Sequence, residues 1–203
     1  MVNVIDIGIG NVHSIKNWVN QCGYECKSVN SAKTIDNSSI IIPGMCNAYS
    51  LMVGLKEKKL DYEIINRATN GQKIIGICAG MQVLSKKIIE DYGCDGLGLI
   101  NFDSKKFSSK NNEQIINNGW IDVDLHYNKT NKKNLFKLSS ERFYFNHQYY
   151  LSRKKINKKY YQVESVFSSK KFVSFFFYKN IFGLQFHPEK SQEAGLELGK
   201  IIL

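Results

Sequence analysis

The sequence predicts an α/β fold with a mostly parallel central sheet, flanked by helices, and an antiparallel β extension. Short apolar runs alternate with helical patterns between residues 2 and 77, and an apolar run at 181–186 precedes a last helical pattern at 194–203. Such alternation is typical of parallel strands joined by helical crossovers. After residue 96 the pattern changes to short β-like runs separated by polar turns, which predicts the antiparallel part.

Length and composition predict one domain over residues 1–203. Hydrophobic residues make up 43% and charged residues 23% of the chain, as in ordinary globular proteins. No apolar run is long enough to span a bilayer, so we expect no membrane contact. The five cysteines lack paired spacing, which predicts reduced thiols in a cytoplasmic protein.

The formal charge of +10 comes from lysines and arginines that are dispersed as pairs among Asn and Ser, such as Lys105-Lys106 and Lys170-Lys171. A nucleic-acid surface is more typical of a dense basic tract. The dispersed pairs favour solvated loop ends, and we expect no nucleic-acid partner. Docking to an acidic protein is an interpretation that the sequence leaves open.

Four apolar strands are predicted in the first half, with helices between them. The strands cover 2–7, 24–29, 39–42 and 74–77, and the helices cover 14–19, 49–60 and 62–69. Gly8-Ile9-Gly10-Asn11 follows the first strand but lacks the third glycine of a dinucleotide fingerprint, so we reject that interpretation. Pro43-Gly44 ends the third strand in a turn. Further β-like runs are predicted at 120–125, 142–150, 160–167 and 173–178.

A cysteine stands at the end of the fourth strand, in Gly76-Ile77-Cys78-Ala79-Gly80. Glycines two residues before and after Cys78 permit a sharp turn into a helix, as in the G-x-S-x-G elbow of hydrolases. The helix N-terminus would present N–H groups to a developing oxyanion. The alternative is that Cys78 is a small buried apolar residue. This stretch alone does not decide between the two.

His187-Pro188-Glu189 follows the last apolar strand. Pro188 restricts His187 to an extended backbone, in which residues two apart project to the same side. Glu189 could therefore orient the imidazole, and His187 could take the thiol proton of Cys78 and deliver it to a leaving amine. A histidine alone is more often a satisfied surface residue, but its pairing with the cysteine elbow favours catalysis.

The remaining histidines, at 13, 126 and 147, do not complete a metal site with any of the cysteines. A metal would require Cys and His clustered at ligand spacing. We therefore expect no metal.

Two motifs together resemble those of the class I (triad) glutamine amidotransferases. They are Gly76-Ile77-Cys78-Ala79-Gly80-Met81-Gln82 and Phe186-His187-Pro188-Glu189-Lys190-Ser191. The resemblance narrows to the glutaminase subunits of imidazole glycerol phosphate synthase through five further stretches, which are Ile5-Asp6 with Gly8-Ile9-Gly10-Asn11, Pro43-Gly44, Gly96-Leu97-Gly98-Leu99-Ile100, Gly119-Trp120, and Tyr144-Phe145-Asn146-His147-Gln148-Tyr149.

This resemblance implies a flavodoxin-like fold and glutaminase chemistry that needs no cofactor. Cys78 would attack the side-chain amide of L-glutamine, release ammonia and leave a glutamyl thioester for water to hydrolyse. The N–H of Ala79 and the loop that contains Gly44, Met45 and Cys46 would bind the oxyanion. Three further residues are expected to contact the substrate, namely Gln82, Gln148 and Tyr149.

The resemblance also implies a partner. Ammonia would pass into a (β/α)₈ cyclase subunit that makes imidazole glycerol phosphate and AICAR in histidine biosynthesis, so we expect a heterodimer. Contact residues would be Asn11, Trp120, Tyr144 and Lys190. Trp120 is the hot-spot candidate because a large aromatic side chain after a glycine in a turn is costly to leave in water. The alternative is an ordinary core tryptophan.

Several positions depart from the family pattern without removing Cys78, His187 or Glu189. Cys46 replaces a glycine of the oxyanion loop, and Gln148 replaces a serine. These departures leave open a paralogous glutaminase that supplies ammonia to another acceptor, such as a sugar-modifying synthetase. A catalytically idle regulatory module is the third hypothesis, and the intact catalytic residues argue against it.

Overall fold

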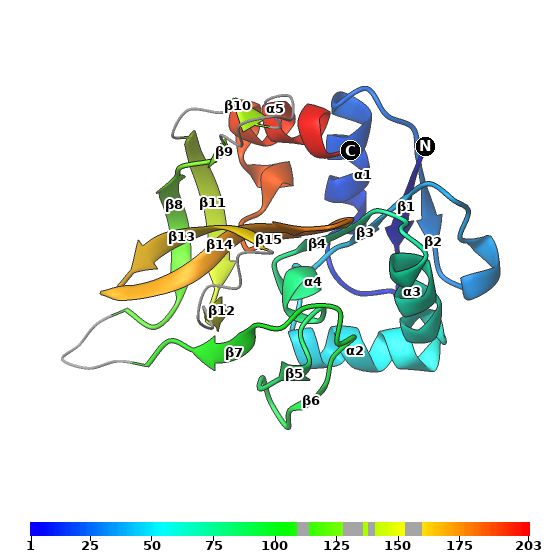
Figure 1. Cartoon of the computed structure of the whole chain (residues 1–203), viewed down its shortest axis with the longest axis horizontal. Helices are drawn as coiled ribbons and strands as arrows, with labels where there is room; N and C mark the ends of the chain where they lie inside the picture. The colour runs from blue at the N-terminus through cyan, green and yellow to red at the C-terminus, as the bar shows by residue number, and fades with distance from the viewer. Residues whose placement is uncertain (109–113, 128–135, 138–140, 153–159) are drawn as a thin grey trace.

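A seven-stranded sheet forms the centre of the computed structural model, which describes residues 1–108, 114–127, 136–137, 141–152 and 160–203. The strand order is β13-β14-β15-β4-β3-β1-β2 (Figure 1). Bounds are Val2–Ile5 (β1), Cys26–Val29 (β2), Ser39–Ile42 (β3), Ile74–Ile77 (β4), Tyr161–Phe167 (β13), Lys170–Tyr178 (β14) and Ile181–Leu184 (β15). Strands β2, β1, β3, β4 and β15 pair in parallel, and β14 and β13 extend the sheet antiparallel. This arrangement confirms the predicted fold class.

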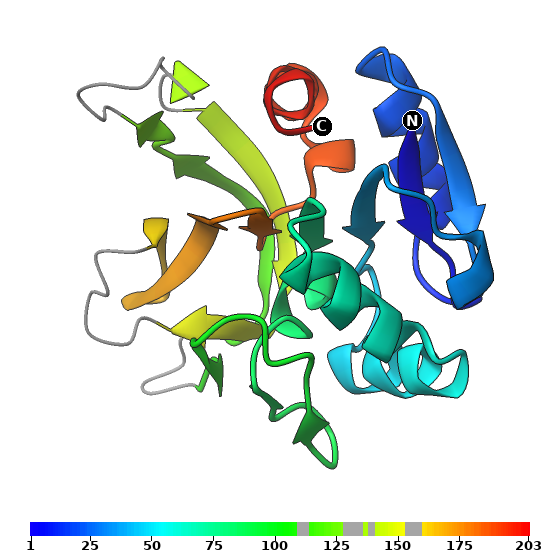
Figure 2. The same cartoon turned by 45° about the vertical axis from the view of Figure 1, so that its right-hand side comes forward.

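Helices cover both faces of the sheet (Figure 2). Bounds are Val12–Gln21 (α1), Ala48–Glu57 (α2), Leu60–Thr69 (α3), Ala79–Gln82 (α4) and Gln192–Ile202 (α5), with short 3₁₀ turns at Ala32–Thr34 (η1) and Pro188–Lys190 (η2). Apolar residues of α1 and α5 pack in one buried cluster, and those of α2, α3 and α4 pack in another. Alternate side chains of a strand point to opposite faces, so β3 contributes Ile41 to the first cluster and Ile40 and Ile42 to the second.

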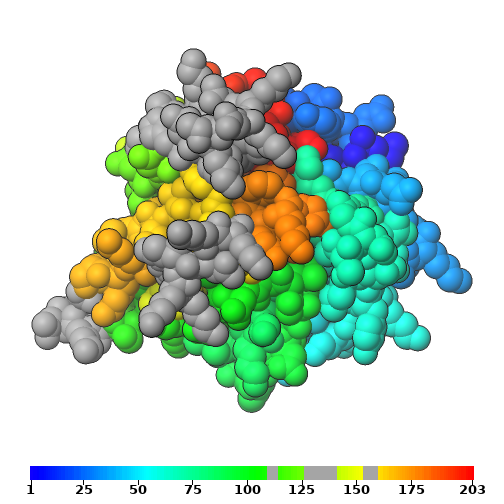
Figure 3. All heavy atoms as spheres, viewed as in Figure 1, coloured from blue at the N-terminus to red at the C-terminus, as the bar shows by residue number. Residues whose placement is uncertain are grey.

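Within the described ranges, four two-stranded ladders lie beside this core. They are β5 (Lys87–Ile88) with β6 (Cys94–Asp95), β7 (Asp103–Lys106) with β12 (Tyr149–Ser152), β8 (Asn117–Val123) with β11 (Glu141–His147), and β9 (His126–Tyr127) with β10 (Phe136–Lys137). The β5–β6 hairpin projects from the lower edge of the molecule in the view of Figures 1 and 3. The β8–β11 ladder lies beside His187, whose amide donates a hydrogen bond of 2.8 Å to the carbonyl of Tyr144 in β11.

Two predicted elements differ from the structure. The helix expected after Cys78 has only four residues, because the amides of Leu97 and Leu99 take the carbonyls of Val83 and Leu84, which would otherwise continue it. The run predicted at 142–150 is two strands, β11 and β12, which break at Gln148 and pair with different partners. Both departures arise from contacts between distant residues, which a local pattern does not record.

Candidate active site

Cys78 occupies the strained turn between β4 and α4. Its backbone has φ 53° and ψ −111°, a region that residues other than glycine rarely adopt. Its amide donates a hydrogen bond of 2.7 Å to the carbonyl of Leu184 at the end of β15. A Cβ atom on Gly80 would collide with the carbonyl oxygen of Ile42, so the close approach of α4 to β3 requires glycine there. The turn therefore holds the thiol at the carboxyl edge of the sheet.

His187 and Glu189 reach the same edge because β15 pairs in parallel with β4. The Nδ1 atom of His187 lies 2.8 Å from the Oε1 atom of Glu189, and both side chains are fully buried. The Nε2 atom of His187 is buried without a hydrogen-bond partner among the described residues. An imidazole held through Nδ1 in this way can accept a proton at Nε2.

The surroundings of His187 favour its protonated form. Burial by itself lowers the pKa of His187, but the sulfur of Cys78 and the carboxylate of Glu189 together raise it to about 10. Asn11 strengthens this arrangement, because its Nδ2 donates a hydrogen bond of 2.6 Å to Oε1 of Glu189. An imidazolium beside an anionic sulfur is the charge state from which a cysteine nucleophile attacks.

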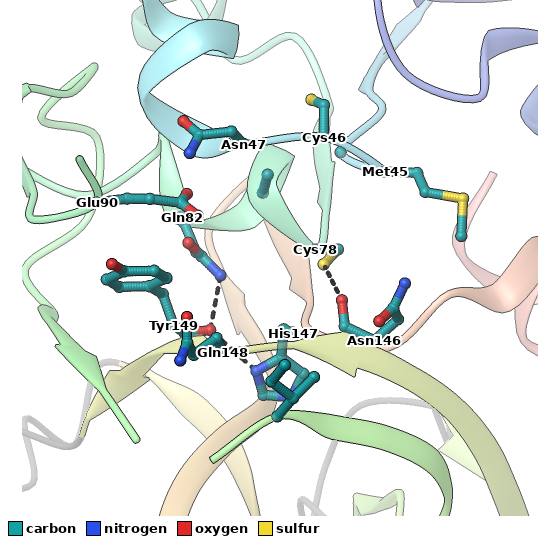
Figure 4. A pocket seen from close by; sticks show the side chains of 13 residues that line it. Met45, Cys46, Asn47, Cys78, Gln82, Glu90, Asn146, His147, Gln148 and Tyr149 are labelled. Atoms are coloured by element: carbon teal, nitrogen blue, oxygen red, sulfur yellow. Dashed lines mark hydrogen bonds between the residues drawn. The ribbon is translucent and has the colours of Figure 1, made fainter. Parts of the chain in front are cut away.

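A pocket of about 330 Å³ opens over Cys78. Its lining contains every residue predicted to bind oxyanion or substrate, which are Gly44, Met45, Cys46, Ala79, Gln82, Gln148 and Tyr149. Gln82 is fixed because its Nε2 donates a hydrogen bond of 2.8 Å to the carbonyl of Tyr149 (Figure 4). The carbonyl of Asn146 lies 3.7 Å from the sulfur of Cys78 on the other side. Because Cys78 and Gln82 both line the pocket, one small molecule can place an amide at the thiol and its other polar groups near Gln82.

The backbone of the Pro43–Asn47 loop touches the turn that carries Cys78. The N–H of Ala79 donates to the carbonyl of Gly44 at 3.3 Å, so the expected oxyanion donor is already occupied. A Cβ atom on Gly44 would collide with backbone atoms of Ile77, Ala79 and Gly80. To free the Ala79 N–H for an oxyanion, the Gly44 carbonyl must turn away.

Glu90 lines the pocket from the β5–β6 hairpin. Its Oε2 accepts a hydrogen bond of 2.6 Å from the amide of Ala48 at the start of α2. Burial raises the pKa of Glu90, and the hydrogen bond from Ala48 opposes that effect. Figure 4 shows Glu90 beside Gln82 and Tyr149, away from Cys78. The pocket therefore has a thiol at one end and a carboxylate at the other.

The comparisons with known proteins agree with this geometry. Residues 3–197 match the family model for class-I glutamine amidotransferases. The chain is 35% identical over 201 residues to imidazole glycerol phosphate synthase subunit HisH 2 of Methanococcus maripaludis, covering 98% of this chain and 96% of that one. The chain belongs to the class-I glutamine amidotransferases.

A second relative agrees with this family, and a solved structure agrees with the fold. Imidazole glycerol phosphate synthase subunit HisH 2 of Pseudomonas aeruginosa is 30% identical over 202 residues, which cover 98% of this chain and 97% of that one. A crystal structure of a glutamine amidotransferase superposes with a TM-score of 0.75 at 18% identity, over 97% of this chain and 95% of that one. The resemblance inferred from the motifs, to the family and to its imidazole glycerol phosphate synthase subunits, is confirmed.

The residues predicted to contact a partner lie near His187 and Glu189 or in the neighbouring β8–β11 ladder. Trp120 is 39% exposed, which excludes the core tryptophan interpretation, and its ring centroid lies 5.9 Å from that of Tyr144. Tyr144 in turn lies 6.4 Å from the ring of His187. Lys190 is exposed and precedes Ser191, whose hydroxyl accepts a hydrogen bond of 3.0 Å from the amide of Tyr144. Asn11 differs from the other three, because its amide contacts Glu189 as well as lying near the surface.

Sequence reasoning missed three residues of this site. Glu90 comes from a hairpin that no local pattern ties to the pocket. Gln185 is fully buried, and its Nε2 lies 3.6 Å from the sulfur of Cys78. His147 is buried with Nδ1 2.9 Å from the carbonyl of Tyr149 and Nε2 3.0 Å from Nδ2 of Asn117. His147 lies inside the stretch 144–149 that was quoted for the resemblance, and Gln185 directly precedes the stretch 186–191. These two motifs could therefore have indicated that both residues belong to the site.

Two kinds of site are not found in the described part of the chain. No group of three or more His, Cys, Asp or Glu side chains is placed there to hold a metal ion. No helix within the described ranges is both long enough and apolar enough to cross a membrane.

Proposed function

We propose that this class-I glutamine amidotransferase hydrolyses L-glutamine as a single domain with Cys78, His187 and Glu189 as its catalytic triad. The observation that carries the proposal is the buried Nε2 of His187, which has no described hydrogen-bond partner and faces the Cys78 sulfur, while Nδ1 is held by Glu189. A general base needs this combination of a fixed ring and a free nitrogen. A cytoplasmic location, which would keep the Cys78 thiol reduced, is part of the proposal.

The reaction proceeds in two halves. His187 takes the proton of Cys78, and the thiolate attacks the side-chain carbonyl carbon of glutamine to form a tetrahedral oxyanion. His187 returns the proton to the leaving amine, so ammonia departs and a glutamyl thioester remains. Water then loses a proton to His187, attacks the thioester, and releases glutamate with the thiol restored.

Glutamine fits the pocket in one direction. Its carboxamide must reach Cys78, so its α-carbon lies toward Gln82, Tyr149 and Glu90. The Glu90 carboxylate is placed to accept hydrogen bonds from the α-ammonium group, which would also keep Glu90 ionised. Gln148 and Tyr149 border the same end, and the loop of Gly44, Met45 and Cys46 covers the carboxamide.

The loop that contains Gly44 must rearrange before an oxyanion can be stabilised and hydrolysis can be fast. The Ala79 N–H is bonded to the Gly44 carbonyl, so the basal state lacks a free donor at that position. Loss of one such donor typically costs about 10²–10³ in rate. Binding of a partner on the face with Trp120, Tyr144 and Lys190, next to His187, would favour the turned loop.

The proposed partner is a (β/α)₈ cyclase subunit that uses the ammonia to make imidazole glycerol phosphate and AICAR in a heterodimer. Support comes from the 35% and 30% identities to proteins named as imidazole glycerol phosphate synthase subunits. The test is the rate of glutamate formation by the chain alone and with the cyclase. We expect the rate of glutamate formation to rise strongly when the complex forms. The control variant Cys78→Ser should form no glutamate with or without the cyclase. Equal rates with and without the cyclase would contradict channelled coupling.

A second candidate is a paralogous subunit that supplies ammonia to another synthetase, for example one that amidates a surface-polysaccharide sugar. The departures at Cys46 and Gln148 favour it, and two relatives carry the number 2 in their names. Neighbouring genes distinguish the two candidates. Histidine-pathway enzymes beside this gene would support the cyclase, and sugar-nucleotide enzymes would support the other acceptor.

A further inference from the structure

Gln185 is a buried polar residue that has no role in the chemistry described so far. It directly follows β15 and is fully buried, although its neighbours Leu184 and Phe186 are apolar. Its Nε2 donates a hydrogen bond of 3.6 Å to the sulfur of Cys78. Its Oε1 is buried without a hydrogen-bond partner among the described residues. A side chain needed only for packing would be apolar here, because an unpartnered buried amide oxygen destabilises the native state.

The backbone fixes this side chain relative to the nucleophile. The carbonyl of Leu184 accepts a hydrogen bond of 2.7 Å from the backbone N–H of Cys78. The backbone N–H of Gln185 donates a hydrogen bond of 2.9 Å to the carbonyl of Ser174 in β14. Two consecutive residues at the end of β15 therefore hold the backbone of Cys78 and contact its sulfur.

The sulfur of Cys78 has two polar neighbours that favour opposite protonation states. The carbonyl of Asn146, at 3.7 Å, can only accept a hydrogen bond, so it favours the thiol. The carboxamide N–H of Gln185 can only donate one, so it favours the thiolate. When His187 takes the thiol proton, the Asn146 contact loses its hydrogen, whereas the Gln185 contact becomes charge-assisted. Gln185 therefore offsets part of the cost of an anionic sulfur in a buried place.

We propose that Gln185 is a further catalytic residue, whose carboxamide N–H stabilises the Cys78 thiolate in both halves of the reaction. The inference rests on the proposed glutaminase function and deepens it. In the first half, the sulfur is anionic from the loss of its proton until its bond to the substrate carbon forms. In the second half, the intermediate formed by water breaks its C–S bond and returns the electron pair to the sulfur. Gln185 does not line the pocket, so we expect it to act on the sulfur without contacting glutamine.

Gln185 could instead serve only to pack the end of β15 against the turn at Cys78. A packing role predicts that loss of the amide destabilises the fold or changes access to the thiol at every pH. A role in stabilising the thiolate predicts that the reactivity of the thiol shifts along the pH axis. The pH dependence of Cys78 alkylation therefore separates the two roles.

The experiment measures alkylation of the full chain by iodoacetamide between about pH 5 and about pH 10. Mass spectrometry of the peptide that contains Cys78 gives the rate for this cysteine alone. Gln185→Met removes the amide at similar length, and Gln185→Leu tests the same loss with a different apolar shape. Ser174→Ala is the matched control, because Ser174 is a fully buried polar residue of β14 whose hydroxyl donates to the carbonyl of Val163.

For Gln185→Met we expect the midpoint of the alkylation profile to move up by about one pH unit, a tenfold change that corresponds to about 1.4 kcal/mol. The rate at the high-pH plateau should stay within about threefold of wild type, because a more basic thiolate is only slightly more nucleophilic. In the complex with the activating partner, kcat for glutamine should fall about tenfold while KM stays within about twofold. Gln185→Leu should change these quantities in the same direction, and Ser174→Ala should match wild type throughout.

Unfolded chains from both Gln185 substitutions, or a lower plateau with an unchanged midpoint, would assign Gln185 a packing role and overturn the inference. Profiles of both variants that coincide with the wild-type profile would overturn it as well, with the proposed function intact. A wild-type complex that does not hydrolyse glutamine would overturn the proposed function and the catalytic role of Gln185 together. The alkylation profile needs no glutamine, so it tests the contact with Cys78 separately from that function.

Discussion

At the scale of single residues, the site contains two buried imidazoles whose pKa values are shifted in opposite directions. His187 is paired with Glu189 and the Cys78 sulfur, which raise its pKa to about 10. His147 lies behind it, and burial lowers its pKa to about 3. The hydrogen bonds of His147 to Tyr149 and Asn117 fit a neutral ring, with Nδ1 as donor and Nε2 as acceptor. The neutral ring can therefore support the pocket wall without adding charge beside His187.

The low pKa of His147 predicts acid sensitivity of the fold. Below the unfolded pKa of about 6.5 the unfolded chain binds a proton that the native state excludes, so stability is lost as pH falls toward 3. At pH 5 the loss from this group is about 2 kcal/mol. Urea unfolding at pH 7.5 and at pH 5 measures it in wild type and in His147→Gln.

His147→Gln removes the titrating group, so we expect a smaller loss of unfolding free energy between the two pH values than in wild type. The raised pKa of His187 acts at higher pH, where stability falls as pH rises from about 6.5 to about 10. The reference at pH 7.5 lies inside that window, but His187 contributes the same change in wild type and in His147→Gln, so the difference between the two proteins isolates His147. An identical pH dependence in wild type and His147→Gln would contradict a neutral buried His147.

At the scale of elements, the oxyanion loop and the turn at Cys78 are in mutual contact. The Gly44 carbonyl occupies the Ala79 N–H, and Cys46 packs toward Gly10, with its sulfur 4.0 Å from a Cβ position there. Burial raises the pKa of Cys46 to about 12, so this thiol stays protonated and acts by its bulk. Figure 4 shows its sulfur turned away from Cys78. We therefore expect the side chain to restrain the loop rather than to join the chemistry.

Cys46→Gly should raise basal glutamine hydrolysis without a partner, by about tenfold. Glycine widens the backbone conformations open to the loop, so the Gly44 carbonyl can leave the Ala79 N–H more often. The measurement is glutamate formation by the isolated chain. Cys94→Gly is the matched control, because Cys94 is a half-buried cysteine of β6 and does not line the pocket. Equal basal rates for wild type and Cys46→Gly would mean that Cys46 does not restrain the loop.

The same elements show what the sequence could predict. The Gly76–Gly80 spacing predicted the turn, and alternating strands and helices predicted the parallel core. The Gly44–Ala79 hydrogen bond and the position of Glu90 could not be predicted, because each depends on backbone contacts between segments far apart in the chain. The break at Gln148 has the same origin, since β11 and β12 pair with different strands.

At the scale of the whole molecule, the sheet brings together the stretches that carry Cys78 and His187. Strands β4 and β15 are neighbours, although more than a hundred residues of chain separate them, and each ends at the same edge. The β8–β11 ladder then places Trp120 and Tyr144 next to His187. A partner bound on this face would therefore contact the side of the molecule closest to the site of ammonia release.

Trp120→Ala should weaken binding of the cyclase by about 10- to 100-fold, because a large aromatic anchor at an interface centre commonly contributes this much. Its ring is 39% exposed, so removing it should change the thermal midpoint little. Tyr62→Ala is the control, since Tyr62 is 77% exposed on α3 and does not line the pocket over Cys78. Titration of labelled chain with cyclase gives both dissociation constants. Equal weakening by the two substitutions would contradict an interface at Trp120.

The central claim is that Cys78 is the nucleophile that attacks the side chain of bound glutamine. A diazo-ketone analogue of glutamine alkylates such a thiol, and mass spectrometry of digested peptides locates the adduct. In the complex with the partner, we predict one adduct per chain, on the peptide that contains Cys78, with protection by L-glutamine and no adduct in His187→Gln. An unlabelled chain, or an adduct on Cys46 instead of Cys78, would contradict the account.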